Sequence, residues 1–531
     1  MSPSNVRLDQ AATDHSRFIA PAKLIALLTA SSRILGLARE CAFSYFFGVH
    51  PLFSSFRVAF MIPNLSRRLF GEGAMSSAFI PVFTEVLHHQ SRDRARQLAG
   101  SALTLLGTVL IGLTVAIELG ITIADLIRPT ATLELTRVMM PYMILICLTA
   151  FAGGMLNSLN HFGAPAAAPM LLNVFIIVAV WAGSRLAGLA GLPLLYVISG
   201  SVVAAGVAQL GLQLLALRRL NCHPQLNLRW GDTDLRRIMV MMGPMLIGLS
   251  ATQLNILADS VIALTLVPNG RGPAVLGYAH MLYNLPLGVF GIALATAIFP
   301  LLSSKAAQND LPGLARVLER GLRMSIFISL PAAVGLILLA EPIVSLLYQR
   351  GQFDETAAGH VRRTLMFYCL GLVAYSTQHI VIRAFYAIKN TRTPMRIGAI
   401  VVSLNITLNL ILVFPLAEGG LALATAICAT IQTIWLTHRL RRQLSEGFGL
   451  GSGFRWRFVA AGTLQAALAT GAMAVIVWWL SRMEGLSQQG DLIQLAVTIP
   501  AGVAIYILAA RALRCQELND LLGKTGTKNQ G

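Results

Sequence analysis

The chain has 531 residues, of which 55% are hydrophobic and 12% are charged, and its formal net charge is +18. Polar side chains are too few to cover a soluble domain of this size, which excludes a chain that folds in water alone. The basic residues form no single arm and do not interleave with exposed aromatic residues, so the charge does not indicate a nucleic-acid partner.

The first segment, residues 1–17, lacks the basic start and short apolar core of a cleavable signal, and we expect it to be a cytoplasmic tail. Apolar runs of about 20 residues, each near the length that crosses a bilayer core, follow as far as Leu513. Because backbone groups in lipid must be hydrogen-bonded within their own segment, these runs predict an all-α polytopic membrane protein with about fourteen transmembrane helices. The expected spans are 18–47, 52–87 (broken at Pro63 and Pro81), 98–125, 138–158, 166–184, 192–217, 238–267, 274–302, 317–348, 364–388, 394–414, 419–438, 456–480 and 491–513.

The loops between these spans run to about twenty residues at most, which is too short for a soluble catalytic domain. Far more basic residues fall on the loops that share a side with the N-terminus than on the opposite loops. Because basic residues resist translocation, both termini are predicted to lie in the cytoplasm. The six cysteines are scattered singly and form no CxxC pair, so neither a disulfide framework nor a zinc site is predicted.

Charged residues within the spans are concentrated in the first two, and an intramembrane charge is costly unless it faces protein or water. This asymmetry predicts a cationic cavity near the N-terminal helices. The planar fork of arginine binds two oxygens and stays charged when partly dehydrated, so the expected ligand is an anion, with phosphate or pyrophosphate preferred. The charged residues of the two spans are Arg33, Arg39, Glu40, Arg57, Arg67, Arg68, Glu72 and Glu85.

Helical spacing places Arg33 and Glu40, seven residues apart, on nearly one face of the first span, about 10 Å apart along the axis. The Arg67 and Arg68 pair follows Pro63 by one turn, where a loosened backbone can border a cavity. The alternative is that this pair and Glu72 form only interfacial ion pairs, with Arg68 reaching to lipid headgroups.

A second polar group lies later in the chain. Asn405 and Asn409 share one face of span eleven, and Asp259 in span seven and Thr425 in span twelve are candidate companions. One carboxylate with amide and hydroxyl oxygens suits a hard cation, so these four residues are a candidate sodium site. The alternative is a set of hydrogen bonds between packed spans.

Several motifs, in collinear order over nearly the whole chain, resemble the MurJ/MviN family. They are Ser32-Arg-Ile-Leu-Gly36, Arg39 with Glu40, Phe47-Gly48, Ile62-Pro-Asn-Leu-Ser-Arg-Arg-Leu-Phe-Gly-Glu-Gly-Ala74, Ala78-Phe-Ile-Pro81, Pro165-Ala-Ala-Ala-Pro-Met-Leu-Leu-Asn173, Gly351-Gln-Phe353, Arg383-Ala-Phe-Tyr-Ala387 and Asn390-Thr-Arg-Thr-Pro394.

The resemblance implies the fold of the multidrug, oligosaccharidyl-lipid and polysaccharide exporter superfamily, in which two six-helix bundles are related by pseudo-twofold symmetry and two C-terminal helices follow. It also implies a multi-pass protein of the bacterial inner membrane that flips lipid II, a polyprenyl-pyrophosphate-linked peptidoglycan precursor, from the cytoplasmic to the periplasmic leaflet and is not an enzyme. The domain boundaries expected are 1–17 (tail), 18–220 (first bundle), 221–237 (cytoplasmic linker), 238–443 (second bundle), 444–514 (two helices forming a groove for the lipid tail) and 515–531 (tail).

By similarity, Arg33, Arg39 and Arg67 fall on the cavity arginines of the family, which are expected to hold the pyrophosphate. Glu40 and Glu72 are expected to form ion pairs with them or to act in gating. The resemblance also places Asp259, Asn405, Asn409 and Thr425 at the ligands of a sodium site, with Asn409 replacing an acidic residue. No other cofactor is implied, and the expected partners are the lipid-linked anion, membrane lipids and cell-wall synthesis proteins.

The chain departs from the family pattern in span eight. Met281 stands where an arginine is usual, and Asn284 stands at an acidic position. In span two, Ser54 replaces an acidic residue and Arg57 an apolar one. We therefore predict that Arg57 supplies the lost cationic contact, or that the substrate headgroup differs.

Flipping by alternating access is the leading hypothesis. The alternatives are a flippase or exporter of another lipid-linked glycan or of a small solute, a membrane transferase, and a scaffold for wall synthesis that transports nothing. A transferase needs catalytic carboxylates or histidines at the membrane face, for which the chain offers Asp354, Glu355 and His360.

Overall fold

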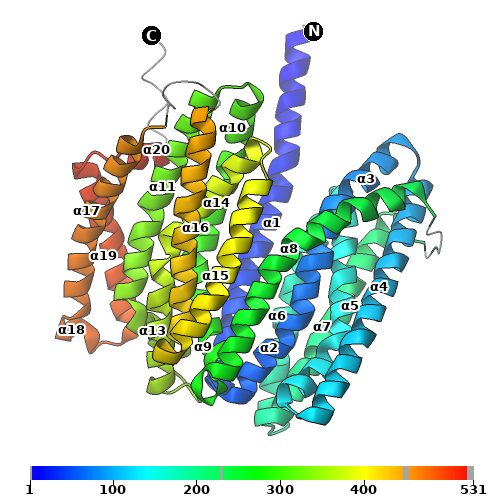
Figure 1. Cartoon of the computed structure of the whole chain (residues 1–531), viewed down its shortest axis with the longest axis horizontal. Coiled ribbons are helices and arrows are strands. Elements are labelled where there is room, and N and C mark those ends of the chain that lie inside the picture. The colour runs from blue at the N-terminus through cyan, green and yellow to red at the C-terminus, as the bar shows by residue number, and fades with distance from the viewer. Residues whose placement is uncertain (1–2, 226, 228–230, 447–453, 523–531) are drawn as a thin grey trace. The chain divides into compact units, whose positions relative to one another are not determined.

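The computed structural model of the chain describes residues 3–225, 227, 231–446 and 454–522. These residues are helical almost throughout, and no strand occurs among them. The prediction of an all-α membrane protein is confirmed. Figure 1 shows the helices along the chain.

The chain divides into two compact units, Met1–Leu257 (unit 1) and Ala258–Gly531 (unit 2). The division falls inside α8 (Thr233–Leu266), so the predicted domain boundaries stay predictions. Unit 1 contains α1 (Pro3–Phe47), α2 (Pro51–Ser66), the π-helical segment η1 (Arg67–Met75), α3 (Ser76–His89), α4 (Arg92–Ile127), α5 (Ala131–Ser158), α6 (Gly163–Arg185) and α7 (Gly191–Arg219).

Within unit 1, α5 is the central helix and packs against α2, α4 and α7, while α1 packs against α6. Of the most apolar stretch of α5, 67% is buried, against 17% for α4. Both stretches are apolar enough to cross a membrane, so the difference in burial shows that α5 is surrounded by protein. Helix α4 instead exposes apolar residues such as Val115, Leu119 and Ile123, as a helix that faces lipid does.

Unit 2 repeats the pattern of long packed helices. It contains η2 (Pro268–Gly270), α9 (Gly272–Pro286), the π-helical segment η3 (Leu287–Ile292), α10 (Ala293–Ala307), α11 (Leu311–Leu338), α12 (Ala340–Tyr348), α13 (Glu355–Leu370), α14 (Leu372–Ala387), α15 (Arg392–Leu416), α16 (Glu418–Glu446), α17 (Trp456–Ser481), α18 (Glu484–Ser487), α19 (Asp491–Ala512) and α20 (Gln516–Leu521). Helices α15 and α16 pack together, as do α17 and α19, and α11 packs against α14 and α17.

Local capping fixes where several helices begin. The side chains of Ser91, Thr130, Asp310 and Asp354 each accept a hydrogen bond from a backbone N–H two or three residues into the helix that follows. Such caps satisfy one of the N–H groups that a helix start leaves without a partner. Each of these four residues therefore marks a boundary that the hydrophobic pattern alone does not define.

Ten helices among the described residues are long and apolar enough to cross a membrane, or eleven if α13 and α14, bent by 42°, form one span. These eleven correspond to expected spans three to six and eight to fourteen. The other expected spans, 18–47, 52–87 and 238–267, lie in α1, in α2 through α3, and in α8. The count of fourteen is therefore still a prediction for these three segments.

The predicted breaks at Pro63 and Pro81 are wrong in position. Both prolines lie inside helices, α2 and α3, and the departure from α-helical geometry is the π-helical segment η1 between them. A proline removes only one backbone donor, and a wider turn next to it lets the remaining groups stay bonded. Unit 2 has the same arrangement, because η3 directly follows Pro286 at the end of α9 and precedes Pro300 in α10.

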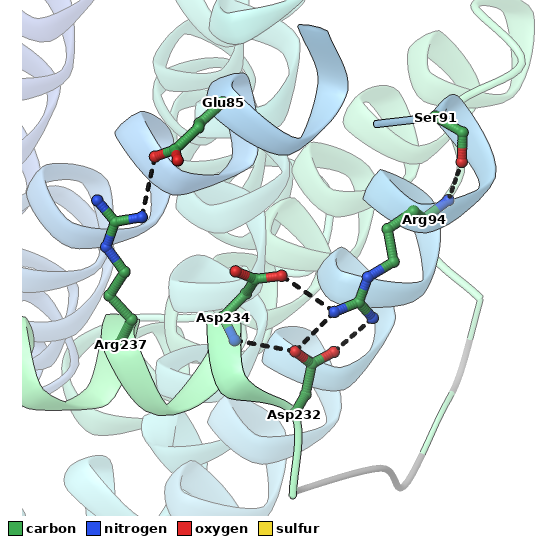
Figure 2. A network of polar contacts seen from close by, with 6 residues as sticks. All are labelled: Glu85, Ser91, Arg94, Asp232, Asp234 and Arg237. Atoms are coloured by element: carbon green, nitrogen blue, oxygen red, sulfur yellow. Dashed lines mark hydrogen bonds and ion pairs between the residues drawn. The ribbon is translucent and has the colours of Figure 1, made fainter. Parts of the chain in front are cut away.

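Charged contacts tie the start of α8 to helices α3 and α4 in unit 1 (Figure 2). The guanidinium of Arg94 donates to Asp232 at 2.6 and 2.8 Å and to Asp234 at 3.0 Å. Arg237 donates to Glu85 at 2.9 Å. A guanidinium that contacts two carboxylates fixes the direction of the contact as well as its distance. These pairs therefore orient the start of α8 relative to α3 and α4.

A buried ion pair holds the last helix of unit 2. Arg323 in α11 pairs with Glu517 in α20, and each side chain is 5% exposed. Arg323 also stacks on Phe458, with the guanidinium carbon 4.0 Å from the ring centroid. At Gly462 in α17, a β-carbon would lie 2.3 Å from Nε of Arg323, so a larger residue there would require the guanidinium to move.

Candidate functional site

The charged residues of α1 and α2 meet in unit 1 around a single carboxylate. Glu40 is only 4% exposed. Its Oε1 accepts a hydrogen bond from Nη2 of Arg39 at 2.8 Å, and its Oε2 pairs with Nη2 of Arg57. The two arginines are half-buried, and their guanidinium groups lie 5.9 Å from the ring centroid of Phe43 and 4.9 Å from that of Phe53, respectively. We call Arg39, Glu40 and Arg57 the arginine cluster.

Asn173 completes the arginine cluster from α6. Its Oδ1 accepts a hydrogen bond from Nη1 of Arg39 at 3.1 Å, and its Nδ2 donates to the carbonyl oxygen of Ser32 at 3.2 Å. This buried amide therefore fixes Arg39 and the backbone of α1 together. Asn173 ends the Pro165–Asn173 motif but is not among the residues predicted to form the site. The available signal was an amide in an otherwise apolar span.

The other charged residues predicted for this site differ in how exposed their side chains are. Arg33 is exposed on α1, about two turns before Glu40 on nearly the same face. Arg67 is the first residue of η1 and half-buried. Arg68 is exposed. The side chain of Glu72 lies outside the described part of the chain, so its predicted role in gating stays a prediction.

The charges of the arginine cluster do not cancel. Two guanidinium groups share one carboxylate, so the three residues of the cluster carry one formal positive charge. A carboxylate that accepts from both arginines lowers the cost of holding them away from water and fixes their positions. The N–H groups not used by Glu40 and Asn173 suit the oxygens of a phosphate.

Unit 2 lacks the corresponding cation in α9. Met281 is half-buried, and Nδ2 of Asn284 lies 2.9 Å from Nδ1 of His280 in the same helix. Tyr283 packs against Tyr368, with ring centroids 5.4 Å apart. The two positions of α9 that are charged in the family pattern therefore hold uncharged side chains here, Met281 and Asn284, next to packed aromatic rings.

The candidate sodium site is assembled in unit 2, except for one member. Nδ2 of Asn409 donates to Oδ1 of Asp259 at 2.6 Å and lies 3.2 Å from Oδ1 of Asn405. Within the described residues, the buried Oδ1 of Asn409 has no hydrogen-bond partner. The Thr425 hydroxyl instead donates to the carbonyl oxygen of Leu421 in its own helix at 2.9 Å.

The oxygen atoms of this group fit a small hard cation. Nδ2 of Asn409 contacts an oxygen of Asp259 and an oxygen of Asn405, and a cation bound between these oxygens would replace that N–H group. If the side-chain amide of Asn409 rotated by half a turn, its unbonded Oδ1 would face the cation. The two asparagines and Asp259 would then supply the ligands, and the hydroxyl of Thr425 would have to leave its helix bond to join them.

The three residues considered for a transferase do not converge. Asp354 caps α13 by accepting from the N–H of Ala357 at 2.7 Å, and Glu355 accepts from Gln349 at 2.6 Å. His360 instead lies 2.6 Å from the buried Glu418. Each of the three side chains thus has a separate partner, and none of these contacts joins two of the three residues.

Comparisons with known proteins point to one family. A family model described as "Lipid II flippase MurJ" matches residues 43–509. A probable lipid II flippase MurJ of Rhizobium meliloti is 35% identical over 91% of this chain and 91% of its own. A second, of Vibrio cholerae, is 32% identical over 97% of this chain and 99% of its own.

Solved structures agree on the fold. The structure titled "Lipid II flippase MurJ, inward closed conformation" superposes with a TM-score of 0.74, covering 94% of this chain and 99% of that one at 23% identity. A multidrug resistance transporter of the MATE family and MOP superfamily, solved in an inward-facing conformation, gives a TM-score of 0.59 at 17% identity, covering 78% of this chain and 94% of its own. This chain therefore shares the helical fold of these two solved structures.

Proposed function

Because this chain belongs to the MurJ family of lipid II flippases, we propose that it moves lipid II from the cytoplasmic to the periplasmic leaflet of a bacterial inner membrane. The arginine cluster is the observation in the structure that supports this function best. Its net positive charge on two neighbouring helices suits the pyrophosphate that links the polyprenyl tail to the disaccharide. The step breaks no covalent bond, so the protein acts as a transporter.

In this proposal Glu40 keeps the arginines in place before the substrate arrives. Without the carboxylate, Arg39 and Arg57 would repel each other and turn toward water, and each substrate would have to reorder two long side chains. With it, the pyrophosphate meets two guanidinium groups that are already oriented. Asn173 does the same for Arg39 from the opposite side.

Arg57 takes over the cationic contact that Met281 cannot provide. Its pairing with Glu40 places it beside Arg39 and not in unit 2. The positive charge proposed to meet the pyrophosphate is thus concentrated in unit 1.

Alternating access would carry the headgroup across while the tail stays in lipid. We propose that sodium resets the empty carrier through Asp259, Asn405 and Asn409. The sodium ion would be coordinated by the side-chain oxygens of these three residues and would balance the charge of the Asp259 carboxylate. The membrane potential adds about 2.3 kcal/mol per charge for each 100 mV, with both termini in the cytoplasm as the basic loops predict.

A flipping assay on the purified protein in lipid vesicles tests the function. Wild-type protein is expected to expose labelled lipid II on the opposite leaflet, and Arg39→Ala to reduce the rate at least tenfold, because it removes one arm of the pyrophosphate contact. The control is Arg128→Ala, an exposed arginine in the loop after α4. Equal rates for Arg39→Ala and wild type would contradict the assignment of the cluster, and no flipping by wild type would contradict the function.

A further inference from the structure

Two phenylalanines pack against the arginine cluster, and the proposed function gives them no role. The guanidinium carbon of Arg57 lies 4.9 Å from the ring centroid of Phe53, and that of Arg39 lies 5.9 Å from the centroid of Phe43. At both distances the face of a ring attracts a cation. The two rings also contact each other, with centroids 4.9 Å apart. We call Phe43 and Phe53 the phenylalanine pair.

The sequence spacing explains why each arginine meets a ring. In α1, Arg39 precedes Phe43 by four residues, and in α2, Phe53 precedes Arg57 by four residues. Residues four apart lie on one face of a helix, one turn from each other. The contacts of Glu40 with Arg57 and of Phe43 with Phe53 show that the two helices run in opposite directions here. The reversed order of arginine and phenylalanine in the two helices therefore brings the arginines together and the rings together.

The carboxylate and the rings hold the arginines by different interactions. Glu40 accepts N–H groups from Arg39 and Arg57, which are the groups that a phosphate oxygen would also use. A phenyl ring attracts the positive charge through its electron-rich face and has no oxygen that accepts a hydrogen bond. Glu40 therefore competes with a bound phosphate for the arginines, whereas the phenylalanine pair does not.

The rings of the phenylalanine pair are fixed by their surroundings. Phe43 is 4% exposed and Phe53 is completely buried. The ring of Phe47 stacks on that of Phe53 with centroids 5.5 Å apart and planes 7° from parallel, and the ring of Phe56 stacks on it at 6.1 Å and 15°. Closely packed buried side chains have little room to change rotamer. The phenylalanine pair is therefore a rigid support for the two guanidinium groups.

We propose that Phe43 and Phe53 are positioning residues for the pyrophosphate, which keep Arg39 and Arg57 in place when a phosphate competes with Glu40 for their N–H groups. This inference rests on the proposed function of the arginine cluster. Glu40 orients the arginines in the empty protein, and the phenylalanine pair keeps that orientation in the occupied one. The larger share falls to Phe53, because its ring is completely buried and lies closer to its guanidinium.

The test is thermal unfolding of the full-length protein in detergent, titrated with undecaprenyl pyrophosphate. Phe53→Leu is expected to raise the ligand concentration for half-maximal stabilisation about fivefold, the size of one partly buried cation–π contact. The matched control is Phe56→Leu, which removes a ring that is 2% exposed and stacks on Phe53. The cation–π contacts of the described residues do not include Phe56. Both variants should unfold at a lower temperature without ligand, but only Phe53→Leu should bind the ligand more weakly.

A double-mutant cycle separates positioning from packing. In an Arg57→Ala background, Phe53→Leu is expected to cause no further loss of ligand affinity, because the ring acts through that guanidinium. If Phe53→Leu does not fold, Phe43→Leu with Arg39→Ala gives the same cycle.

The inference is overturned if Phe56→Leu weakens ligand binding as much as Phe53→Leu does, or if Phe53→Leu has the same effect with and without Arg57. Either result leaves the proposed function of the arginine cluster standing. If wild-type protein gains no stability from undecaprenyl pyrophosphate, the proposed role of the cluster and this inference both fail.

Discussion

Arg57 of α2 forms an ion pair with Glu40 of α1, and the carboxylate that joins the two helices is almost completely buried. Arg57 stands where the family pattern has an apolar residue, and the ion pair with Glu40 gives this unusual arginine a defined partner. It also means that the two residues must be tested both separately and in combination with Met281.

Removal of the Glu40 carboxylate is expected to lower the stability of the fold and to increase the positive charge of the arginine cluster. Glu40→Gln leaves two guanidinium groups side by side in a partly buried site, which should cost about 3 kcal/mol of unfolding free energy. The variant is also expected to gain more thermal stabilisation from undecaprenyl pyrophosphate than wild type gains, because the ligand then replaces the lost negative charge. Thermal unfolding with and without this ligand measures both effects. Glu85→Gln, an exposed member of a pair, is the control.

Loss of Arg57 is expected to reduce flipping about tenfold, and Arg57→Lys to have a smaller effect, because lysine keeps the charge without the fork. The decisive variant is Arg57→Ala/Met281→Arg, which returns the cation to its usual family position. We expect it to recover part of the lost rate in the vesicle assay. If Arg57→Ala alone still complements a strain depleted of its own flippase, Arg57 does not compensate for Met281.

The sodium hypothesis predicts a gain as well as a loss. Asn409→Asp adds a second carboxylate beside Asp259 and should raise the apparent sodium affinity about tenfold, because charge count dominates hard-cation sites. Asp259→Ala should abolish the response. The measurement is the thermal stabilisation of the purified protein in a sodium titration, with potassium replacing sodium to keep ionic strength constant. An unchanged response in both variants would leave interhelical hydrogen bonding as the role of this group.

The contacts of Figure 2 should give the protein a defined acid sensitivity. Hydrogen bonds from Arg94 hold the pKa of Asp232 below its ordinary value of 3.8. Because the pKa of Asp232 is lower in the folded state than in the unfolded state, its ionised carboxylate stabilises the folded state at pH values above the ordinary pKa. This stabilisation is lost as the pH falls through the pKa of the folded state. We therefore expect Asp232→Asn to lower the unfolding temperature at neutral pH, and this effect to shrink as the pH falls below 3.8. Asp93→Asn, whose side chain is 80% exposed, is the control.

The buried pair of α11 and α20 should be among the most sensitive sites to substitution. Arg323→Ala leaves Glu517 buried without its cation and is expected to cost about 3 to 5 kcal/mol. Gly462→Ala should act on the same pair without touching either charge, because its β-carbon overlaps Arg323. Both variants should make the segment around α20 sensitive to protease. If Gly462→Ala is as stable as wild type, Arg323 can move at little cost.

The spans could be predicted from the sequence because bilayer thickness fixes their length, and most expected spans correspond to helices here. The proximity of Arg39, Glu40 and Arg57 was also accessible, since intramembrane charges rarely lack a reason. Asn173 was not. It reaches Ser32 across 141 residues of sequence, through the packing of α6 on α1, and a neutral amide carries no charge to draw notice.

Backbone geometry was the second limit. The prolines were expected to break the second span, whereas the structure carries the helix through both and places η1 between them. Hydropathy does not report how a helix redistributes its hydrogen bonds around a missing donor.

The segments η1 and η3 have a mechanical consequence. A π turn holds one residue more than an α turn, and such a wide turn can migrate along a helix as neighbouring hydrogen bonds exchange, so a span can change its bend without presenting a bare amide to hydrocarbon. Each unit has its own such joint. Each unit can therefore adjust the bend of its own span at this segment.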